Sequence, residues 1–174
     1  MNSKQNGLPV IVFAGYSGSG KTQLISALIP LFRAAGLKSG VIKHAHHGLD
    51  LDTPGKDTYR FRDAGAQQVL VASNQRWALL TENSRPADPE LEVLLQHLDH
   101  TALDLVLVEG FKHWRGPKYE VHRAGNAKPL LYPEDASIIA IITDQALIPP
   151  HPPRLDLNQA DAVFQFMREH WNDF

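Results

Sequence analysis

The chain contains no cysteine among its 174 residues. This absence excludes disulfide bonds, thiolate metal sites and cysteine nucleophiles. Long apolar runs are also missing, since no stretch approaches the roughly 20 residues that a membrane-spanning helix needs. Residues 1–7 are polar and carry no signal-peptide pattern. We therefore expect a cytoplasmic protein that has no membrane partner.

A strong charge of one sign is absent as well. The net charge of −2 argues against a nucleic-acid partner, because nucleic-acid-binding surfaces are strongly basic. The hydrophobic share of 43% and the charged share of 21% are ordinary for a globular protein. We find no repeat and no linker composition, so the sequence predicts one domain over residues 1–174 with a real core.

Strand patterns and helix patterns alternate along the chain. Apolar runs typical of strands buried on both faces of a parallel sheet occupy residues 8–14, 41–42, 104–109 and 138–143. Apolar stripes at helical spacing occupy residues 24–32, 90–98 and 161–171. We expect a bend in the first helix near Pro30, because proline removes a backbone hydrogen bond. This alternation predicts an α/β domain with a mostly parallel sheet.

Three further elements have weaker signals. Thr53-Pro54 is typical of an N-cap followed by proline at the first helical position, which predicts a helix that runs to Ala64. Two apolar runs at 68–73 and 77–81 predict a β-hairpin, with Trp77 packed rather than stacked on a ligand. Residues 118–123 predict a short polar strand.

A glycine-rich loop lies between the first predicted strand and the first predicted helix. It reads Gly15-Tyr16-Ser17-Gly18-Ser19-Gly20-Lys21-Thr22. Its glycines let backbone N–H groups curl around phosphate oxygens, and the following helix presents its positive end to the same anion. We expect Lys21 to reach the β- and γ-phosphates and to face solvent in the empty loop, while the Thr22 hydroxyl binds Mg²⁺. The loop predicts a P-loop fold of three layers.

Two carboxylates follow buried strands. Glu109 closes the run at 104–109, where a carboxylate would hold Mg²⁺ directly or through water. Asp144 follows the run at 138–143, at a place where guanine is recognised in P-loop GTPases. The usual Asn-Lys-x-Asp motif is absent, so a plain turn residue is an equal alternative for Asp144.

Histidines and charges gather after the second predicted strand. His44, His46 and His47 could bind zinc or nickel, but without cysteine a phosphate-contacting or solvated cluster is the favoured interpretation. Charged residues follow at Asp50, Asp52, Lys56, Asp57, Arg60 and Arg62. A solvated loop and helix face explains most of them, and a switch-like loop that senses the γ-phosphate is the alternative.

Several of these segments together resemble the molybdopterin-guanine dinucleotide biosynthesis protein B (MobB) family. Besides the P-loop they are the runs at 41–47, 53–59, 63–66, 75–79 and 105–112. The resemblance implies a GTP-binding accessory protein of molybdenum-cofactor maturation, with weak Mg²⁺-dependent GTPase activity, whose residues 15–22 bind phosphate and whose Glu109 supports the metal. Tyr16 stands where some members of the wider class have a lysine that acts across a dimer.

The resemblance also implies partners. These are a second copy of the chain in a homodimer, the molybdopterin guanylyltransferase, and further molybdopterin or molybdoenzyme chaperones. Candidate dimer regions are the hairpin at 68–81 and the strand near 118–123.

Two other functions remain open at this point. A metallochaperone GTPase would share the core but usually binds its metal through cysteine. An ATP-dependent small-molecule kinase or ligase would need an acceptor pocket and an arginine-rich lid, and only Lys112, Arg115 and Lys118 favour it.

Overall fold

The computed structural model describes residues 7–45, 53–85, 87–149 and 151–171. Its contacts divide the chain into two compact units. One unit comprises Met1–His44 and Glu90–Phe174, and the other comprises Ala45–Pro89. The expectation of one domain over residues 1–174 stays a prediction. Among the described residues no helix is long and apolar enough to cross a bilayer.

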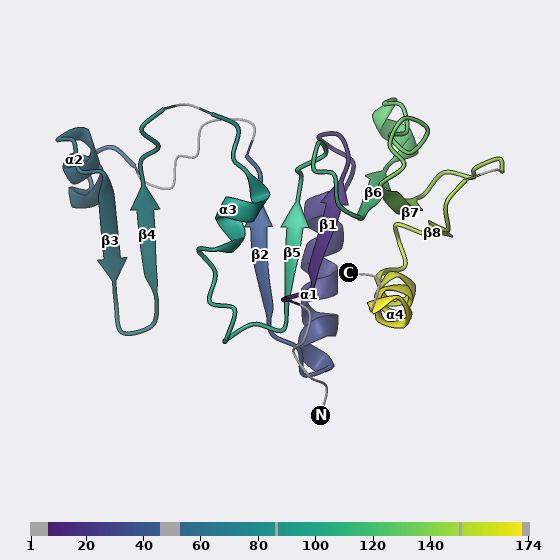
Figure 1. Cartoon of the computed structure of the whole chain (residues 1–174), viewed down its shortest axis with the longest axis horizontal. Helices are drawn as coiled ribbons and strands as arrows, with labels where there is room; N and C mark the ends of the chain where they lie inside the picture. Colours follow the sequence, from purple (N-terminus) through teal and green to yellow (C-terminus); the bar gives the residue numbers. More distant parts are fainter. Residues whose placement is uncertain (1–6, 46–52, 86, 150, 172–174) are drawn as a thin grey trace. The chain divides into compact units, whose positions relative to one another are not determined.

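The larger unit is built on one parallel sheet of six strands in the order β2-β5-β1-β6-β7-β8 (Figure 1). The strands are β1 (Val10–Ala14), β2 (Ser39–Lys43), β5 (Leu105–Glu109), β6 (Lys118–His122), β7 (Ile138–Thr143) and β8 (Arg154–Leu155). Every neighbouring pair is parallel. The carboxyl ends of all strands therefore meet at one edge, where ligands bind in open α/β sheets.

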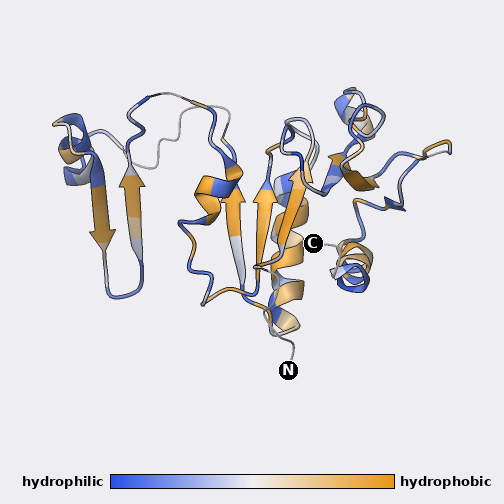
Figure 2. Ribbon diagram, viewed as in Figure 1, coloured by the Kyte–Doolittle hydropathy of each residue, from blue (hydrophilic) through white to orange (hydrophobic). Residues whose placement is uncertain are grey.

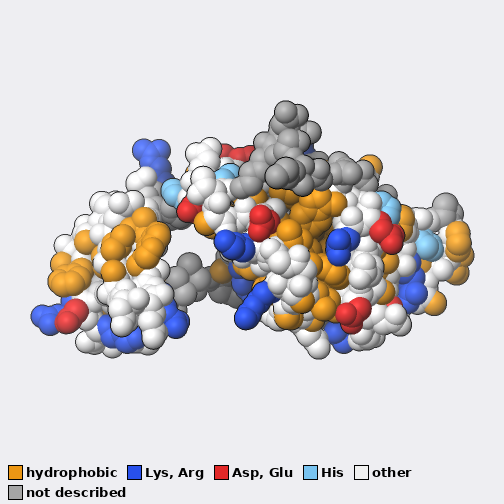
Figure 3. Space-filling model, turned by 90° about the horizontal axis from the view of Figure 1, so that it is seen from below, with side chains coloured by type: hydrophobic (Ala, Val, Ile, Leu, Met, Phe, Trp, Pro, Cys, Tyr) orange, Lys and Arg blue, Asp and Glu red, His pale blue; other side chains and the backbone are white. Residues whose placement is uncertain are grey.

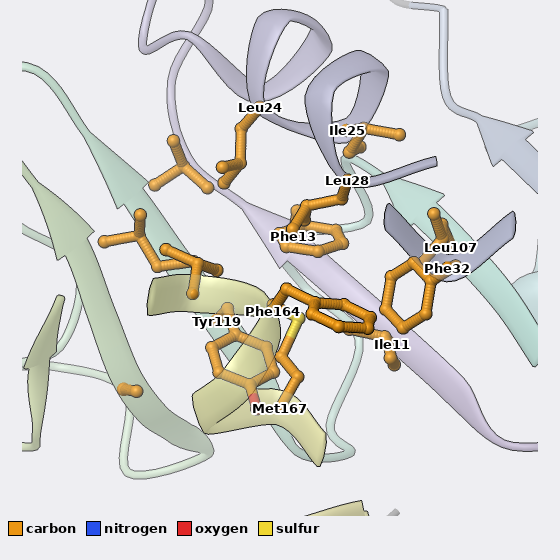
Figure 4. Close-up of a cluster of buried hydrophobic side chains, with 14 of the residues drawn as sticks. Ile11, Phe13, Leu24, Ile25, Leu28, Phe32, Leu107, Tyr119, Phe164 and Met167 are labelled. Carbon is orange, nitrogen blue, oxygen red and sulfur yellow. The ribbon is translucent and has the colours of Figure 1, made fainter. Parts of the chain in front are cut away.

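Helices cover both faces of this sheet. α1 (Lys21–Ala34) and α4 (Ala160–Glu169) lie on one face, where Phe32 meets Phe164 edge to face at 5.1 Å between ring centroids. Figure 4 shows this core, in which α1, α4 and the side chains of β1 converge. α3 (Leu91–Leu95) covers the other face, where Leu91 packs against Val12 and Val106. The predicted three-layer fold is confirmed.

The central strands consist mostly of consecutive apolar residues, as Figure 2 shows for β1 and β5, so both of their faces are apolar. In β1, Ile11 and Phe13 pack towards α1 and α4, while Val12 packs towards α3. This alternation is the signature of a strand with helices on both sides. The continuous apolar run therefore predicted the strand and its burial together.

The smaller unit consists of α2 (Asp57–Asp63) and the antiparallel hairpin of β3 (Gln68–Ala72) and β4 (Trp77–Thr81). The predicted hairpin is confirmed. The predicted helix start at Thr53 is wrong: residues 53–56 form a turn, in which the Lys56 N–H donates to the Thr53 carbonyl at 3.3 Å, and the helix begins at Asp57. Its end is as predicted, because Gly65 adopts a φ of 99° directly after the last turn.

Two other expectations need correction. The predicted strand near 118–123 is present as β6, but it is a central strand that pairs with β1 and β7, and all five of its residues are buried. It therefore offers no free edge to a second copy of the chain. Trp77 does not pack within the chain, since it is 69% exposed.

The short strand β8 was not predicted, because two residues after a proline-rich stretch show no periodicity.

Candidate functional site

The loop between β1 and α1 has the backbone of a phosphate cradle. Gly15, Gly18 and Gly20 adopt positive φ angles of 148°, 79° and 95°, which only glycine adopts readily. A Cβ on Gly15 would lie 2.2 Å from the carbonyl oxygen of Val121. Gly15 is therefore fixed both by its conformation and by the close approach of β6. α1 begins directly at Lys21, so its positive end faces the loop.

Hydrogen bonds hold the side chain of Lys21 inside the loop. Its ammonium donates hydrogen bonds to the carbonyl oxygens of Gly15 at 2.9 Å and of Tyr16 at 2.7 Å, and lies 3.4 Å from the Ser19 hydroxyl. The expectation that Lys21 faces solvent is wrong, because it is buried. Burial lowers the pKa of Lys21, while the Glu109 carboxylate opposes this shift and the Lys43 ammonium adds to it. A bound phosphate would favour the charged form.

Thr22 and Glu109, the two residues predicted to hold the metal, are in contact. The Thr22 hydroxyl donates to the Glu109 carboxylate, with its oxygen 2.8 Å and 2.9 Å from the two carboxylate oxygens. Lys43 joins them: its ammonium lies 3.2 Å from Thr22 Oγ1 and 3.2 Å from Glu109 Oε1. A cation already lies against these hard oxygen atoms, and such atoms are the ligands that Mg²⁺ prefers. The residues present therefore fit Mg²⁺.

Asp144 lies apart from these residues. Its Oδ1 accepts a hydrogen bond from the Ala124 N–H at 2.8 Å, so one oxygen holds the loop that follows β6. A shallow pocket of about 170 Å³ lies between that loop, α1 and the segment before α4. It is lined by Gly20, Gln23, Leu24, Ala27, Arg123, Leu157, Asn158 and Ala160, and Asp144 is not among them. The role of Asp144 in base recognition stays a prediction.

Two loops that flank the P-loop contact it directly. The ammonium of Lys112 lies 5.5 Å from the ring centroid of Tyr16, a cation–π distance. From the other loop, the Asn126 side-chain amide donates to the Ser17 carbonyl at 2.8 Å. These contacts restrain the outer part of the loop, residues 16–18, from both sides.

Buried polar side chains of β6 form hydrogen bonds to the same two loops. Lys118 donates to the carbonyl oxygens of Lys112, at 2.9 Å, and of Trp114, and pairs with Asp135 at 2.8 Å. Glu120 accepts from the backbone N–H groups of Leu131 and Tyr132 at 2.6 Å and 2.9 Å. Burial raises the pKa of Glu120, although both hydrogen bonds oppose the shift. β6 thus fixes the surroundings of the P-loop.

The histidine cluster is only partly described. His44 lies beside the Phe111 ring with 4.9 Å between centroids, whereas His46 and His47 lie outside the described residues, as do Asp50 and Asp52. Within the described part of the chain no group of three or more histidine, cysteine or acidic residues could hold a metal ion.

Sequence reasoning missed Lys43, Arg123 and Asn126 as site residues. Lys43 carried a usable signal, since it ends a strand as Glu109 does and carboxyl ends of parallel strands meet. Arg123 and Asn126 follow β6, whose central position could not be recognised from its mixed polar sequence.

A parallel sheet with the P-loop after a central strand, and a Thr–Glu pair beside it, defines the class of P-loop α/β proteins. Within this class, the chain matches the family of molybdopterin guanine dinucleotide synthesis protein B (MobB) over residues 10–144. The chain belongs to this family, which confirms the resemblance seen in the sequence.

Curated relatives and solved structures agree. The chain is 42% identical over 163 residues to the molybdopterin-guanine dinucleotide biosynthesis adapter protein of Escherichia coli K12, covering 93% of each chain. It is 42% identical over 167 residues to the adapter protein of the same name from Haemophilus influenzae, covering 95% of this chain and 90% of that one. Crystal structures of a MobB homologue from Bacillus stearothermophilus (TM-score 0.70, 23% identity, 95% and 99% coverage) and of Bacillus subtilis MobB (TM-score 0.69, 26% identity, 90% and 96% coverage) share the fold.

Proposed function

We propose that this protein is a GTP-binding adapter in the synthesis of molybdopterin guanine dinucleotide. The observation that carries the proposal is the convergence of Lys21, Thr22 and Glu109 at the end of a glycine-rich loop. The two relatives at 42% identity are named as adapter proteins of this biosynthesis. Because nucleoside triphosphates are made and used in the cytoplasm, the proposal places the protein there.

The phosphates of the nucleotide would lie in the curl of residues 15–20, with Lys21 beside the β- and γ-phosphates. Thr22 and Glu109 would hold Mg²⁺, which when bound supplies charge neutralisation at the phosphates. The base would enter the shallow pocket beside Gly20 and Arg123. At that size the pocket accepts one ring system rather than a whole drug-sized ligand, which needs roughly 300 Å³ or more.

GTP hydrolysis would be weak. A fast GTPase needs a group that orients the attacking water and a further cation that stabilises the transition state, often glutamine and arginine. The contacts described around Thr22 and Glu109 involve lysines and neither of those two residue types. Slow turnover suits an adapter whose bound nucleotide controls an interaction with a partner, for which the molybdopterin guanylyltransferase is our candidate.

The protein would act as a homodimer through its hairpin. Leu70 pairs with Leu79, and Ala72 pairs with Trp77, so these four side chains share one face of the hairpin. On it Leu70 is 61% exposed and Trp77 is 69% exposed. Figure 3 shows apolar side chains gathered on the surface of this unit. An exposed apolar face of this kind marks an interaction site, and a two-stranded hairpin is marginally stable without a partner.

Calorimetric titration tests the nucleotide site. The wild-type protein is expected to bind GTP with Mg²⁺ and to bind ATP more weakly. Lys21→Met keeps the volume of the buried stem and removes the ammonium, so GTP affinity should fall about tenfold or more, the value of a lost charge-assisted hydrogen bond.

Lys38→Met is the matched control, because Lys38 is an exposed lysine directly before the amino end of β2, far from the carboxyl end where the site lies. It should bind GTP as the wild type does. Unchanged GTP affinity in a folded Lys21→Met variant would contradict the phosphate site. Equal affinity for ATP and GTP would instead favour a kinase or ligase.

A further inference from the structure

Lys43 lies beside the proposed metal position. It is the last residue of β2 and pairs with Glu109, the last residue of the neighbouring strand β5. Its ammonium contacts both oxygen-bearing groups of that position, Thr22 Oγ1 and Glu109 Oε1, each at 3.2 Å. Half of its side chain remains exposed, at 54%, whereas Glu109 is 12% exposed. Lys43 is thus a half-exposed cation in contact with two oxygen-bearing side chains.

This arrangement cannot persist once a divalent cation shares the same oxygen atoms. Two unit charges 4 Å apart repel by about 4 kcal/mol at the effective dielectric near a protein surface, and a divalent ion doubles this. The four-carbon stem of a lysine turns about several bonds, and exposure leaves the Lys43 ammonium free to swing away. Its new position should be beside the nearest uncompensated anion.

The order of the strands indicates that this anion is the terminal phosphate of a bound nucleotide. The pocket proposed for the base lies on the β6-to-β8 side of the P-loop, beside Arg123 and Asn158. Glu109 and Lys43 lie on the opposite side, at the ends of β5 and β2. A nucleotide that places its base in the pocket therefore directs its terminal phosphate towards Lys43. At neutral pH that phosphate carries about two negative charges, since its second pKa is about 6.

We propose that Lys43 distinguishes a nucleoside triphosphate from the diphosphate, by exchanging its contacts with Thr22 and Glu109 for the γ-phosphate of a bound Mg²⁺–triphosphate. This inference rests on the proposed function of the P-loop. In the diphosphate complex no phosphate extends beyond the position held by Lys21, so Lys43 gains no new partner.

The first test compares two nucleotides by calorimetry with Mg²⁺: GDP and a GTP analogue that resists hydrolysis. In Lys43→Met the preference for the analogue over GDP should fall about tenfold, as expected for one lost charge-assisted hydrogen bond to the γ-phosphate. Loss of the competing ammonium affects the Mg²⁺ complexes of both nucleotides alike and cancels in this ratio. Lys38→Met, directly before the amino end of β2, should change neither affinity. An equal loss for both nucleotides, or no loss, would overturn the proposal.

The second test follows the displacement itself. Mg²⁺ is titrated into the protein at a constant GDP concentration. The Mg²⁺ concentration that gives half-maximal Mg²⁺ binding should be lower in Lys43→Met than in the wild type, because no ammonium competes with Mg²⁺ for the oxygen atoms of Thr22 and Glu109. Lys43→Arg keeps the charge and should retain the wild-type Mg²⁺ requirement and preference for the triphosphate. An unchanged Mg²⁺ requirement in Lys43→Met would exclude the exchange. If the wild type binds neither nucleotide, the P-loop function itself fails, which is distinct from a failure confined to Lys43.

Discussion

Single residues of β6 link the core of the sheet to the loops around the P-loop. Lys118 is almost fully buried, with its side chain 2% exposed, and its ion-pair partner Asp135 is 29% exposed. Burial alone would raise the pKa of Asp135, but the hydrogen bonds and the charge of Lys118, together with hydrogen bonds from Ser137, lower it. The pair therefore stabilises the folded state as long as Asp135 is ionised.

Asp135→Asn should destabilise the protein by about 3 kcal/mol at neutral pH, because it leaves a buried ammonium without its counter-charge. The folded pKa of Asp135 lies below its unfolded value of 3.8. The stabilisation is thus complete well above pH 3.8 and is lost as the pH falls through the folded pKa. Urea unfolding of both proteins should give a constant difference at neutral pH that narrows below pH 3.8. A difference that grew on acidification would contradict this account.

Residue types predicted which side chains of the candidate site lie together better than they predicted its surroundings. Lys21, Thr22 and Glu109 lie together as their motif and strand-end positions predicted. Lys21 is nevertheless buried, because the carbonyl oxygens of the loop hold its ammonium. Which groups enclose a loop depends on contacts over long sequence distances, such as that of Asn126 with Ser17, and a single sequence does not display them.

Among the elements, the P-loop depends on β6 for its shape. β6 approaches so closely that a Cβ on Gly15 would lie 2.2 Å from the Val121 carbonyl oxygen and 2.9 Å from Ser19 Oγ. The backbone oxygen cannot rotate away as a side chain could. The junction of β1 and the loop therefore admits glycine alone.

Gly15→Ala should lower the free energy of unfolding by about 4 kcal/mol or more, a size reached only when strain or clash cannot be relieved. Thermal unfolding with a fluorescence or circular dichroism readout measures it. Gly125→Ala is the control, because Gly125 lies in the loop after β6 and an added Cβ there meets no atom within 4 Å. Similar melting temperatures for the two variants would show that the loop relaxes around Gly15.

Elements with a strong periodic signal were predicted almost to their ends, as for β5, β7 and the hairpin. Those with mixed signals were not. The alternating Lys118, Glu120 and His122 predicted a polar strand and did not reveal its central position, because each of these side chains is buried against a loop that satisfies it. Thr53-Pro54 looked like a helix start, but the chain first makes a turn before Asp57.

For the whole molecule, the hairpin face predicts self-association. Trp77→Ser should raise the dimer dissociation constant by about thirtyfold, since a buried interface tryptophan contributes about 2 kcal/mol or more. Sedimentation velocity over a range of protein concentrations measures this constant. The fold of the chain should be unaffected, because Trp77 makes little contact within one copy.

Ile148→Ser serves as its control, since Ile148 is 89% exposed in the larger unit and lies outside the hairpin. It should leave the dissociation constant unchanged. A wild-type protein that stays monomeric at every concentration would contradict the dimer, and equal effects of the two substitutions would indicate nonspecific association.

The order of strands in the sheet has a consequence for synthesis on the ribosome. β1 is finished at Ala14, but its two neighbours, β5 and β6, end only at Glu109 and His122. At about 5–20 residues per second, roughly 100 further residues keep the nascent β1 waiting for on the order of 5–20 s. During that time its apolar residues have no sheet to join. The P-loop, which β6 approaches so closely at Gly15, therefore acquires its shape only after residue 122 has been made.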